Sequence, residues 1–167
     1  GMNGYLPEKS GILLTNSIEE DEIQTYKATL TYLEDGTNQS DDMNKTIEGR
    51  FNIIDTNNTV DIEGTVENAE DLTKVTINSE YKESVIYSDG TYKFVGVKPD
   101  IHTIRTVGTE TKEIGKLSII KGDTASTGTT TLDGISIPQI TITNDSRTVT
   151  IDVNAAAKTT TVNEIIN

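Results

Sequence analysis

The sequence has no cysteine and no tryptophan, and it has a single histidine, His102. Without cysteine the chain forms no disulfide, and it lacks the thiolates of nucleophilic, zinc-binding and iron–sulfur sites. One histidine excludes any catalytic scheme that uses two imidazoles, together with most histidine-based metal sites. The composition therefore removes several large classes of enzyme before any pattern is considered.

Basic residues are also scarce: 14 Lys and Arg stand against 27 Asp and Glu, for a formal net charge of −13. Nucleic acids and anionic membrane surfaces are bound through clustered Lys and Arg, so we expect neither as a partner. Apolar stretches reach only three residues, as in Ile12-Leu13-Leu14, and a membrane span needs roughly 18, so we expect no membrane insertion. The acidic excess is compatible with cation binding and with solubility.

β-Branched residues are abundant, because 28 Thr, 21 Ile and 10 Val make up 59 of the 167 residues. Such side chains fit a pleated surface and predict an all-β fold. From residue 60 to residue 165, apolar and polar positions alternate in short runs, and turn residues recur about every 8–12 positions, which indicates an antiparallel Ig-like β-sandwich. Within it, Ile140 and Ile142 are expected to pair with Val149, Ile151 and Val153 across a turn at 144–146.

The first 58 residues are less regular and more acidic, with 11 acidic and 4 basic side chains, a net charge of −7. Ser17-Ile18-Glu19-Glu20 fits a capping box, so a short helix over 18–24 is possible, with a solvated acidic loop as the alternative. Strands are expected over 25–32 and 47–54. Two strands cannot close a core alone, so we expect residues 1–58 to pack on a main sandwich domain of residues 59–167. Any cation or partner site is sought first in this acidic segment.

Residues 62–107 carry a more specific pattern of turns and strands. In order, it reads Gly64-Thr65-Val66, Val75-Thr76-Ile77, Ser88-Asp89-Gly90-Thr91-Tyr92-Lys93-Phe94, Gly96-Val97-Lys98-Pro99 and His102-Thr103-Ile104. This order resembles the carboxypeptidase regulatory-domain-like family of prealbumin-like (transthyretin-like) β-sandwiches, and residues 116–153 resemble its closing strands more weakly. The chain departs from the family pattern at Asp100, where Gly is usual, and at His102, where an inward Tyr is usual.

The resemblance implies a location and a kind of role. Such modules are commonly appended to secreted enzymes and surface proteins of bacteria, so it implies a non-catalytic extracellular module, secreted or anchored at the cell surface, for adhesion, presentation or protein–protein interaction. Its partner would be a protein or a glycan. The alternative is a carbohydrate-binding accessory module of a secreted hydrolase, which needs exposed aromatic side chains such as a flat platform of Tyr5, Tyr81 and Tyr87.

The motif residues are expected to be framework, with no catalytic residue and no required cofactor. Asp89 and Gly90 are expected to form the turn of a tight hairpin, with Gly90 at positive φ and the return strand over Tyr92 and Phe94. Tyr92 and Phe94 point into the core. His102 shares its strand face with Ile104, which predicts a packed and hydrogen-bonded histidine. Of the remaining motif positions, Gly64 belongs to a strand, and Gly96 and Pro99 belong to a turn.

Two further hypotheses concern bound calcium and a covalent cross-link. Asp55, Asn57 and Asp61 place oxygen ligands of the type that Ca²⁺ prefers in and beside one turn, although solvated turn residues are the simpler interpretation. Asp35, Asp41 and Asp42 form a second such group. An internal isopeptide, known in a related surface module, would join Lys27 or Lys74 to Asn144 or Asn154, but Thr106 stands where its assisting Glu is expected.

Overall fold

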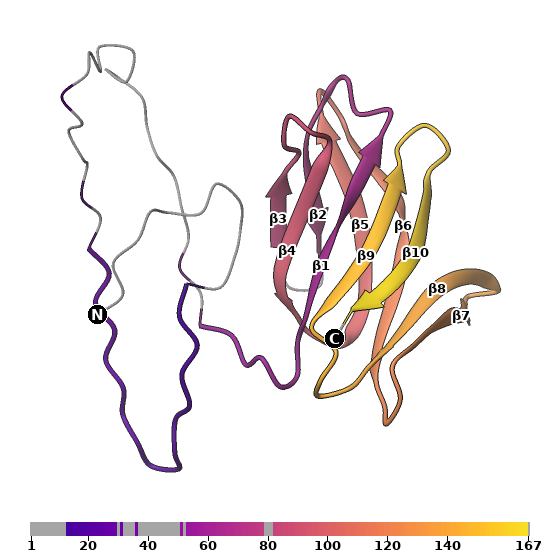
Figure 1. Ribbon diagram of the computed structural model, residues 1–167. Helices are drawn as coiled ribbons and strands as arrows, with labels where there is room; N and C mark the ends of the chain where they lie inside the picture. Colours follow the sequence, from indigo (N-terminus) through magenta and orange to yellow (C-terminus); the bar gives the residue numbers. More distant parts are fainter. Residues whose placement is uncertain are drawn as a thin grey trace. The chain divides into compact units, whose positions relative to one another are not determined.

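The computed structural model describes residues 13–29, 31, 36, 51, 53–78 and 82–166, and within these ranges the chain is an all-β sandwich (Figure 1). These ranges contain no helix, and therefore none long and apolar enough to cross a membrane. The ten strands are β1 (Val60–Glu67), β2 (Leu72–Ile77), β3 (Lys82–Val85), β4 (Thr91–Val97), β5 (Asp100–Gly108), β6 (Thr111–Lys121), β7 (Ser126–Leu132), β8 (Ile135–Ile142), β9 (Thr148–Asn154) and β10 (Thr159–Ile166).

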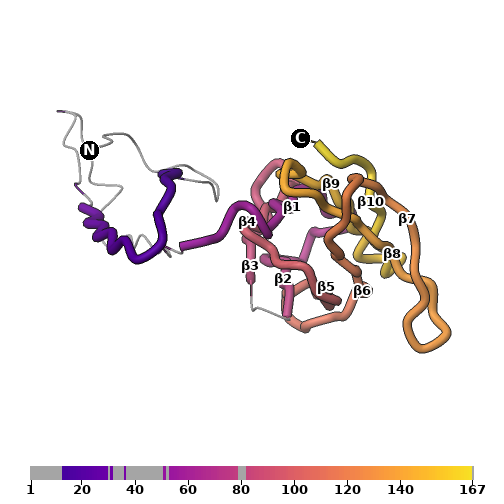
Figure 2. The backbone as a smooth tube through the Cα atoms, turned by 90° about the horizontal axis from the view of Figure 1, so that it is seen from below, coloured from indigo at the N-terminus to yellow at the C-terminus, as the bar shows by residue number. Residues whose placement is uncertain are grey.

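The strands form two sheets that face each other, as Figures 1 and 2 show from two directions. The four-stranded sheet has the order β10-β9-β1-β4, and the six-stranded sheet has the order β3-β2-β5-β6-β8-β7. Most neighbours are antiparallel, as expected, but β1 with β9 and β6 with β8 are parallel. Between β1 and β9 the chain passes through the other sheet, whereas β8 inserts between β6 and β7 within one sheet, so neither parallel pair is joined by a direct hairpin.

The core lies between the sheets and is built from the inward positions of nearly every strand. On β9, Val149, Ile151 and Val153 are fully buried, whereas Thr150 and Asp152 between them are half-buried and face outward. The rings of Tyr92 and Phe94 on β4 meet edge to face, with centroids 5.4 Å apart. Such a ring pair adds about 1 kcal/mol beyond its buried area. The alternation of Ile and Val with Thr therefore separates the inner face from the outer one.

The predicted hairpin between β8 and β9 is wrong. β8 lies between β6 and β7, whereas β9 lies between β1 and β10 in the other sheet. Ile140, Ile142, Val149 and Ile151 are all fully buried, because the two strands face each other across the core. Alternation specifies which face of each strand is buried. It does not specify whether two such strands lie side by side in one sheet or in two sheets that face each other across the core.

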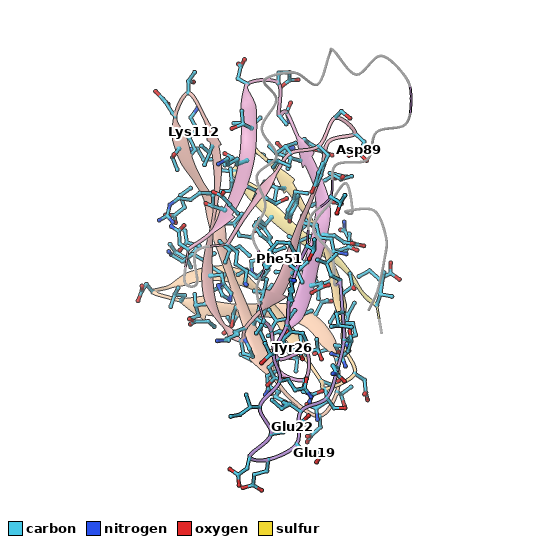
Figure 3. All side chains as sticks on the ribbon, turned by 90° about the vertical axis from the view of Figure 1, so that its left-hand side faces the viewer. Glu19, Glu22, Tyr26, Phe51, Asp89 and Lys112 are labelled. Carbon is cyan, nitrogen blue, oxygen red and sulfur yellow. The ribbon has the colours of Figure 1, made fainter. Side chains whose placement is uncertain are left out.

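The predicted helix over 18–24 is also wrong, because this stretch contains a turn at Glu20 and Asp21. The N–H of Glu22 donates to the carbonyl oxygen of Glu19 (3.1 Å), and the carboxylate of Glu22 accepts from the N–H of Glu19 (3.0 Å; Figure 3). Asp21 has φ = 65°, which a helix does not allow. Local side-chain hydrogen bonds compete with a helix too short to be stable alone.

The chain divides into two compact units, of which one is Leu13–Ile53 and the other contains residues 54–166. Residues 25–29 and 31 lie in no strand, nor do residues 51, 53 and 54, so the two strands expected before residue 58 are not present at these positions. The remaining positions of both strands lie outside the described residues. That residues 1–58 pack on the sandwich stays a prediction.

Candidate functional site

Gly64 lies where the backbones of β1 and β9 approach most closely. A Cβ atom at this position would lie 1.8 Å from the carbonyl oxygen of Ile151. The Asp152 carboxylate accepts hydrogen bonds from the N–H and the hydroxyl of Thr65, at 2.9 and 2.8 Å. The carbonyl of Ile151 instead accepts from the Tyr92 hydroxyl at 2.7 Å. The pairing of β1 with β9 is interrupted at Gly64 and Thr65. Hydrogen bonds from Thr65 to Asp152 and from Tyr92 to Ile151 take the place of the missing ladder bonds.

The phenol of Tyr92 acts here as a hydrogen-bond donor in the core. Burial, and to a lesser degree the Asp152 carboxylate, raise the pKa of Tyr92 well above its usual value. Both effects disfavour a negative charge on the ring oxygen. The hydroxyl therefore stays protonated and links β4 to β9 across β1 within the four-stranded sheet.

Asp89 and Gly90 form a tight turn, but the hairpin expected there is wrong, because β3 and β4 lie in different sheets. Gly90 has φ = 79°, and its N–H donates to the carbonyl oxygen of Tyr87 at 2.8 Å. The Asp89 carboxylate accepts from the N–H and the hydroxyl of Thr91, at 3.0 and 2.6 Å. Figure 3 shows Asp89 at the same end of the sandwich as Lys112, which lies near the start of β6 in the other sheet. The carboxylate is occupied in shaping the turn that leads from β3 to β4.

Gly96, Pro99 and His102 lie around the crossing from β4 to β5, where the chain passes between sheets. Gly96 has φ = 69°, and a Cβ there would come within 2.7 Å of Ile54. His102 is completely buried, and its Nε2 lies 2.7 Å from the carbonyl oxygen of Lys98. Because a carbonyl only accepts, Nε2 carries the hydrogen. The histidine thus fastens the crossing to β5.

The candidate calcium ligands are used by the protein itself. Asp55 accepts from the N–H of Asn57 (2.9 Å) and from the Asn58 side chain (3.0 Å), and these bonds lower the pKa of Asp55. Asp61 accepts from the N–H of Gly96 at 3.0 Å. Among the described residues no three acidic or histidine side chains gather as a metal site. The second group, Asp35, Asp41 and Asp42, lies outside them.

Within the sandwich, Lys74 and Asn154, two of the residues considered for an isopeptide, do not come together. Lys74 on β2 pairs with Glu83 at 3.4 Å, whereas Asn154 on β9, in the other sheet, donates to Glu67 at 2.9 Å. Thr106 is buried on β5, and its hydroxyl has no hydrogen-bond partner. A different lysine, Lys121, reaches an asparagine, and it donates an exposed hydrogen bond to Asn58 at 2.7 Å.

Of the three tyrosines expected to form the aromatic platform of a carbohydrate site, only Tyr87 lies among the described residues. Tyr87 is half-buried, and Tyr5 and Tyr81 lie outside the described residues. The strongly exposed aromatic side chains among the described positions are Tyr26 (52% exposed) and Phe51 (67%), which both belong to the Leu13–Ile53 unit and are labelled in Figure 3. The described part of the sandwich therefore presents no exposed pair of rings.

Two open hollows of about 270 and 260 Å³ lie on the sandwich, and both are lined more by polar than by apolar surface. The first is at the carboxyl ends of the parallel strands β6 and β8. The second lies over β1, β9 and β10, where Asp152 also accepts from the Asn163 side chain. The residues that line the first hollow are Lys121, Gly122, Asp123, Thr143, Asn144 and Asp145. Those that line the second are Glu67, Asp152, Val153, Asn154, Thr159, Thr161 and Asn163.

A feature that sequence reasoning missed is the ribbon formed by β7 and β8, whose strands are joined by Asp133 and Gly134. These two residues have φ = 50° and 78°, as a two-residue type I′ turn requires. β8 pairs with β6 only from Gln139 to Ile142. Pro138 has no N–H to give to β6, so the ladder ends there. Figures 1 and 2 both show the ribbon departing from β6.

β7 is the outer edge of the six-stranded sheet, and no described strand pairs with its far side. It has seven residues with no charge and no proline, its pairing with β8 runs without a bulge, and Ser126 to Thr129 are all exposed. An edge strand of this kind is open to pairing with another chain. The signal in the sequence was the uncharged run of Thr before Asp133-Gly134.

No protein-family model, no curated protein and no solved structure matches this chain.

Proposed function

We propose that this chain is a non-catalytic extracellular module of a bacterial surface or secreted protein, and that it acts by binding another protein. The location rests on the resemblance of residues 62–107 to carboxypeptidase regulatory-domain-like modules. The turn and core roles of Gly64, Gly90, Tyr92 and His102 support that resemblance, because each motif side chain or backbone serves the framework.

The strand order favours the prealbumin-like type over the Ig-like type. In an immunoglobulin constant domain the first strand of the four-stranded sheet pairs with the second strand of the chain. Here β1 is central in its sheet and pairs with β4 and β9, whereas β2 belongs to the other sheet. The finer assignment to a prealbumin-like module is therefore part of this proposal.

The observation that carries the binding role is the free edge of β7. A partner that adds a strand there gains main-chain hydrogen bonds along an exposed strand that lacks the usual protective charges. β7 pairs with β8 on its inner side, and no described strand pairs with its outer side. Binding through an edge needs no cleft, which agrees with the shallow polar hollows on the sandwich.

The location is tested with antibodies raised against the purified chain and applied to intact cells that express the gene, and to their culture medium. We expect labelling of intact cells or detection in the medium, and loss of surface labelling when external protease is added. Labelling only after permeabilisation would refute the extracellular assignment. A cytoplasmic protein released by lysis serves as the control for cell integrity.

A further inference from the structure

We propose that β7 is a site of strand addition for an extended segment of another protein, uncharged in its middle and basic at both ends. This rests on the proposed function, in that the partner is a protein, and it names the surface and the chemistry of that partner. The evidence is the backbone of β7, the contrast with the other sheet edges, and the charges at its two ends.

The backbone groups available on β7 follow from its hairpin with β8. The two-residue turn joins Leu132 and Ile135 as a hydrogen-bonded pair, and such pairs recur at every second residue. Gly128 and Thr130 thus bond to β8, while the N–H and C=O groups of the intervening residues point to the free side. These intervening residues are Thr127, Thr129 and Thr131, and their side chains are exposed.

The other three sheet edges have protective features that β7 lacks. β3 has four residues and carries Lys82 and Glu83. β10 carries Glu164 next to a register shift, and β4 carries Lys93. Short length, charge and bulges are the devices that keep sheet edges from pairing with other chains. Among the described strands, β7 is thus the edge best suited to accept one.

The charges around β7 select the partner. Asp123 precedes the strand and Asp133 follows it, and both are exposed. The seven-residue strand spans about 23 Å and the two aspartates lie beyond its ends, so a partner with a basic residue beyond each end of the paired segment meets both carboxylates. A second copy of this chain would bring its own two aspartates to the same place and a formal charge of −13 against −13. Charge complementarity therefore favours a basic-ended foreign segment.

The test uses the full chain and two labelled peptides that share an alternating Thr-Val centre of seven residues, one with Lys at both ends and one with Glu. In fluorescence anisotropy the Lys peptide should bind about tenfold more tightly at low salt, since two exposed ion pairs each contribute up to about 1 kcal/mol, and high salt should reduce the difference. Equal affinities for the two peptides would overturn the charge assignment.

Amide hydrogen exchange locates the bound peptide. The Lys peptide should slow exchange at Thr127, Thr129 and Thr131, whereas Gly128 and Thr130, already bonded to β8, should change little. Protection confined to other strands, or none at a saturating peptide concentration, would overturn the proposal. A dimer of the chain alone that protects the same three amides would assign the edge to a second copy and also overturn it.

Two variants separate the backbone from the side chain. Thr129→Pro removes an outward N–H and should lower the affinity at least tenfold, while Thr129→Val keeps the N–H and should bind as the wild type does. Should Thr129→Pro fail to fold, the double reversal Asp123→Lys with Asp133→Lys should invert the preference in favour of the Glu peptide. Failure of all peptide binding with positive surface labelling refutes strand addition alone, whereas negative surface labelling refutes the proposed location.

Discussion

The Tyr92 hydroxyl on β4 donates a hydrogen bond of 2.7 Å to the carbonyl oxygen of Ile151 on β9, 59 residues further along the chain. In a regular parallel ladder this carbonyl would bond to β1. Here the N–H of Thr65 turns to Asp152 instead, and the close approach of Gly64 leaves room for no side chain. One phenol thus satisfies a buried acceptor that the sheet itself leaves open.

Replacing Tyr92 with Phe should destabilise the protein by about 1–3 kcal/mol, because the carbonyl of Ile151 is then buried without a partner. The ring itself remains, so the packing against Phe94 is kept. Urea unfolding followed by circular dichroism measures the change. Thr129→Val, on the exposed edge, is the control and should change stability by less than about 0.5 kcal/mol. An unchanged midpoint for Tyr92→Phe would contradict the role given to this bond.

Stability should fall as the pH rises above about 10, the pKa of an unperturbed tyrosine. The pKa of Tyr92 is raised in the folded protein, so above this pH the unfolded chain loses a proton that the native chain keeps. The stabilising contribution is thus complete below pH 10 and declines above it, by about 1.4 kcal/mol per pH unit. Unfolding measured between pH 8 and 11.5 should show a steeper decline in the wild type than in Tyr92→Phe, and parallel curves would refute the assignment.

Gly64→Ala should be severely destabilising, by about 3 kcal/mol or more, because its Cβ would meet the backbone of Ile151 at 1.8 Å and neither strand can yield without breaking pairs. Gly128→Ala is the matched control in the other sheet. Nothing lies within 4 Å of a Cβ there, so the change should be close to neutral. The two urea midpoints decide the matter, and similar values for both variants would show that the approach at Gly64 is not rigid.

Added calcium should leave the melting temperature of the chain unchanged. The carboxylates of Asp55 and Asp61 already accept hydrogen bonds from Asn57, Asn58 and Gly96. Asp61→Ala should lower the melting temperature equally with calcium and with EDTA, because the loss is that of a bond to backbone N–H. A rise of several degrees in millimolar calcium that EDTA reverses would instead support a cation site.

Within the sandwich, from residue 60 onward, the sequence by itself indicated the main strands and which side of them is buried, whereas the strands expected over 25–32 and 47–54 are not present at the described positions. Ile and Val alternating with Thr produce this result residue by residue, because side chains on a strand point to opposite faces in turn. Tyr92, Phe94 and His102 could be placed in the core on the same ground, and Asp89-Gly90 supplies a turn through its own backbone preferences. All of these depend on neighbours within a few positions.

Tertiary structure alone decided which strands are neighbours and what each polar group bonds to. The buried faces of β8 and β9 would suit a hairpin equally well, and only the packing of the whole core places them in opposite sheets. The partnership of Asp152 with Thr65 joins residues 87 positions apart, and the missing N–H of Pro138 matters only because β6 lies beside it. Alternation is a local property of the chain, whereas pairing depends on contacts between distant segments that no short pattern encodes.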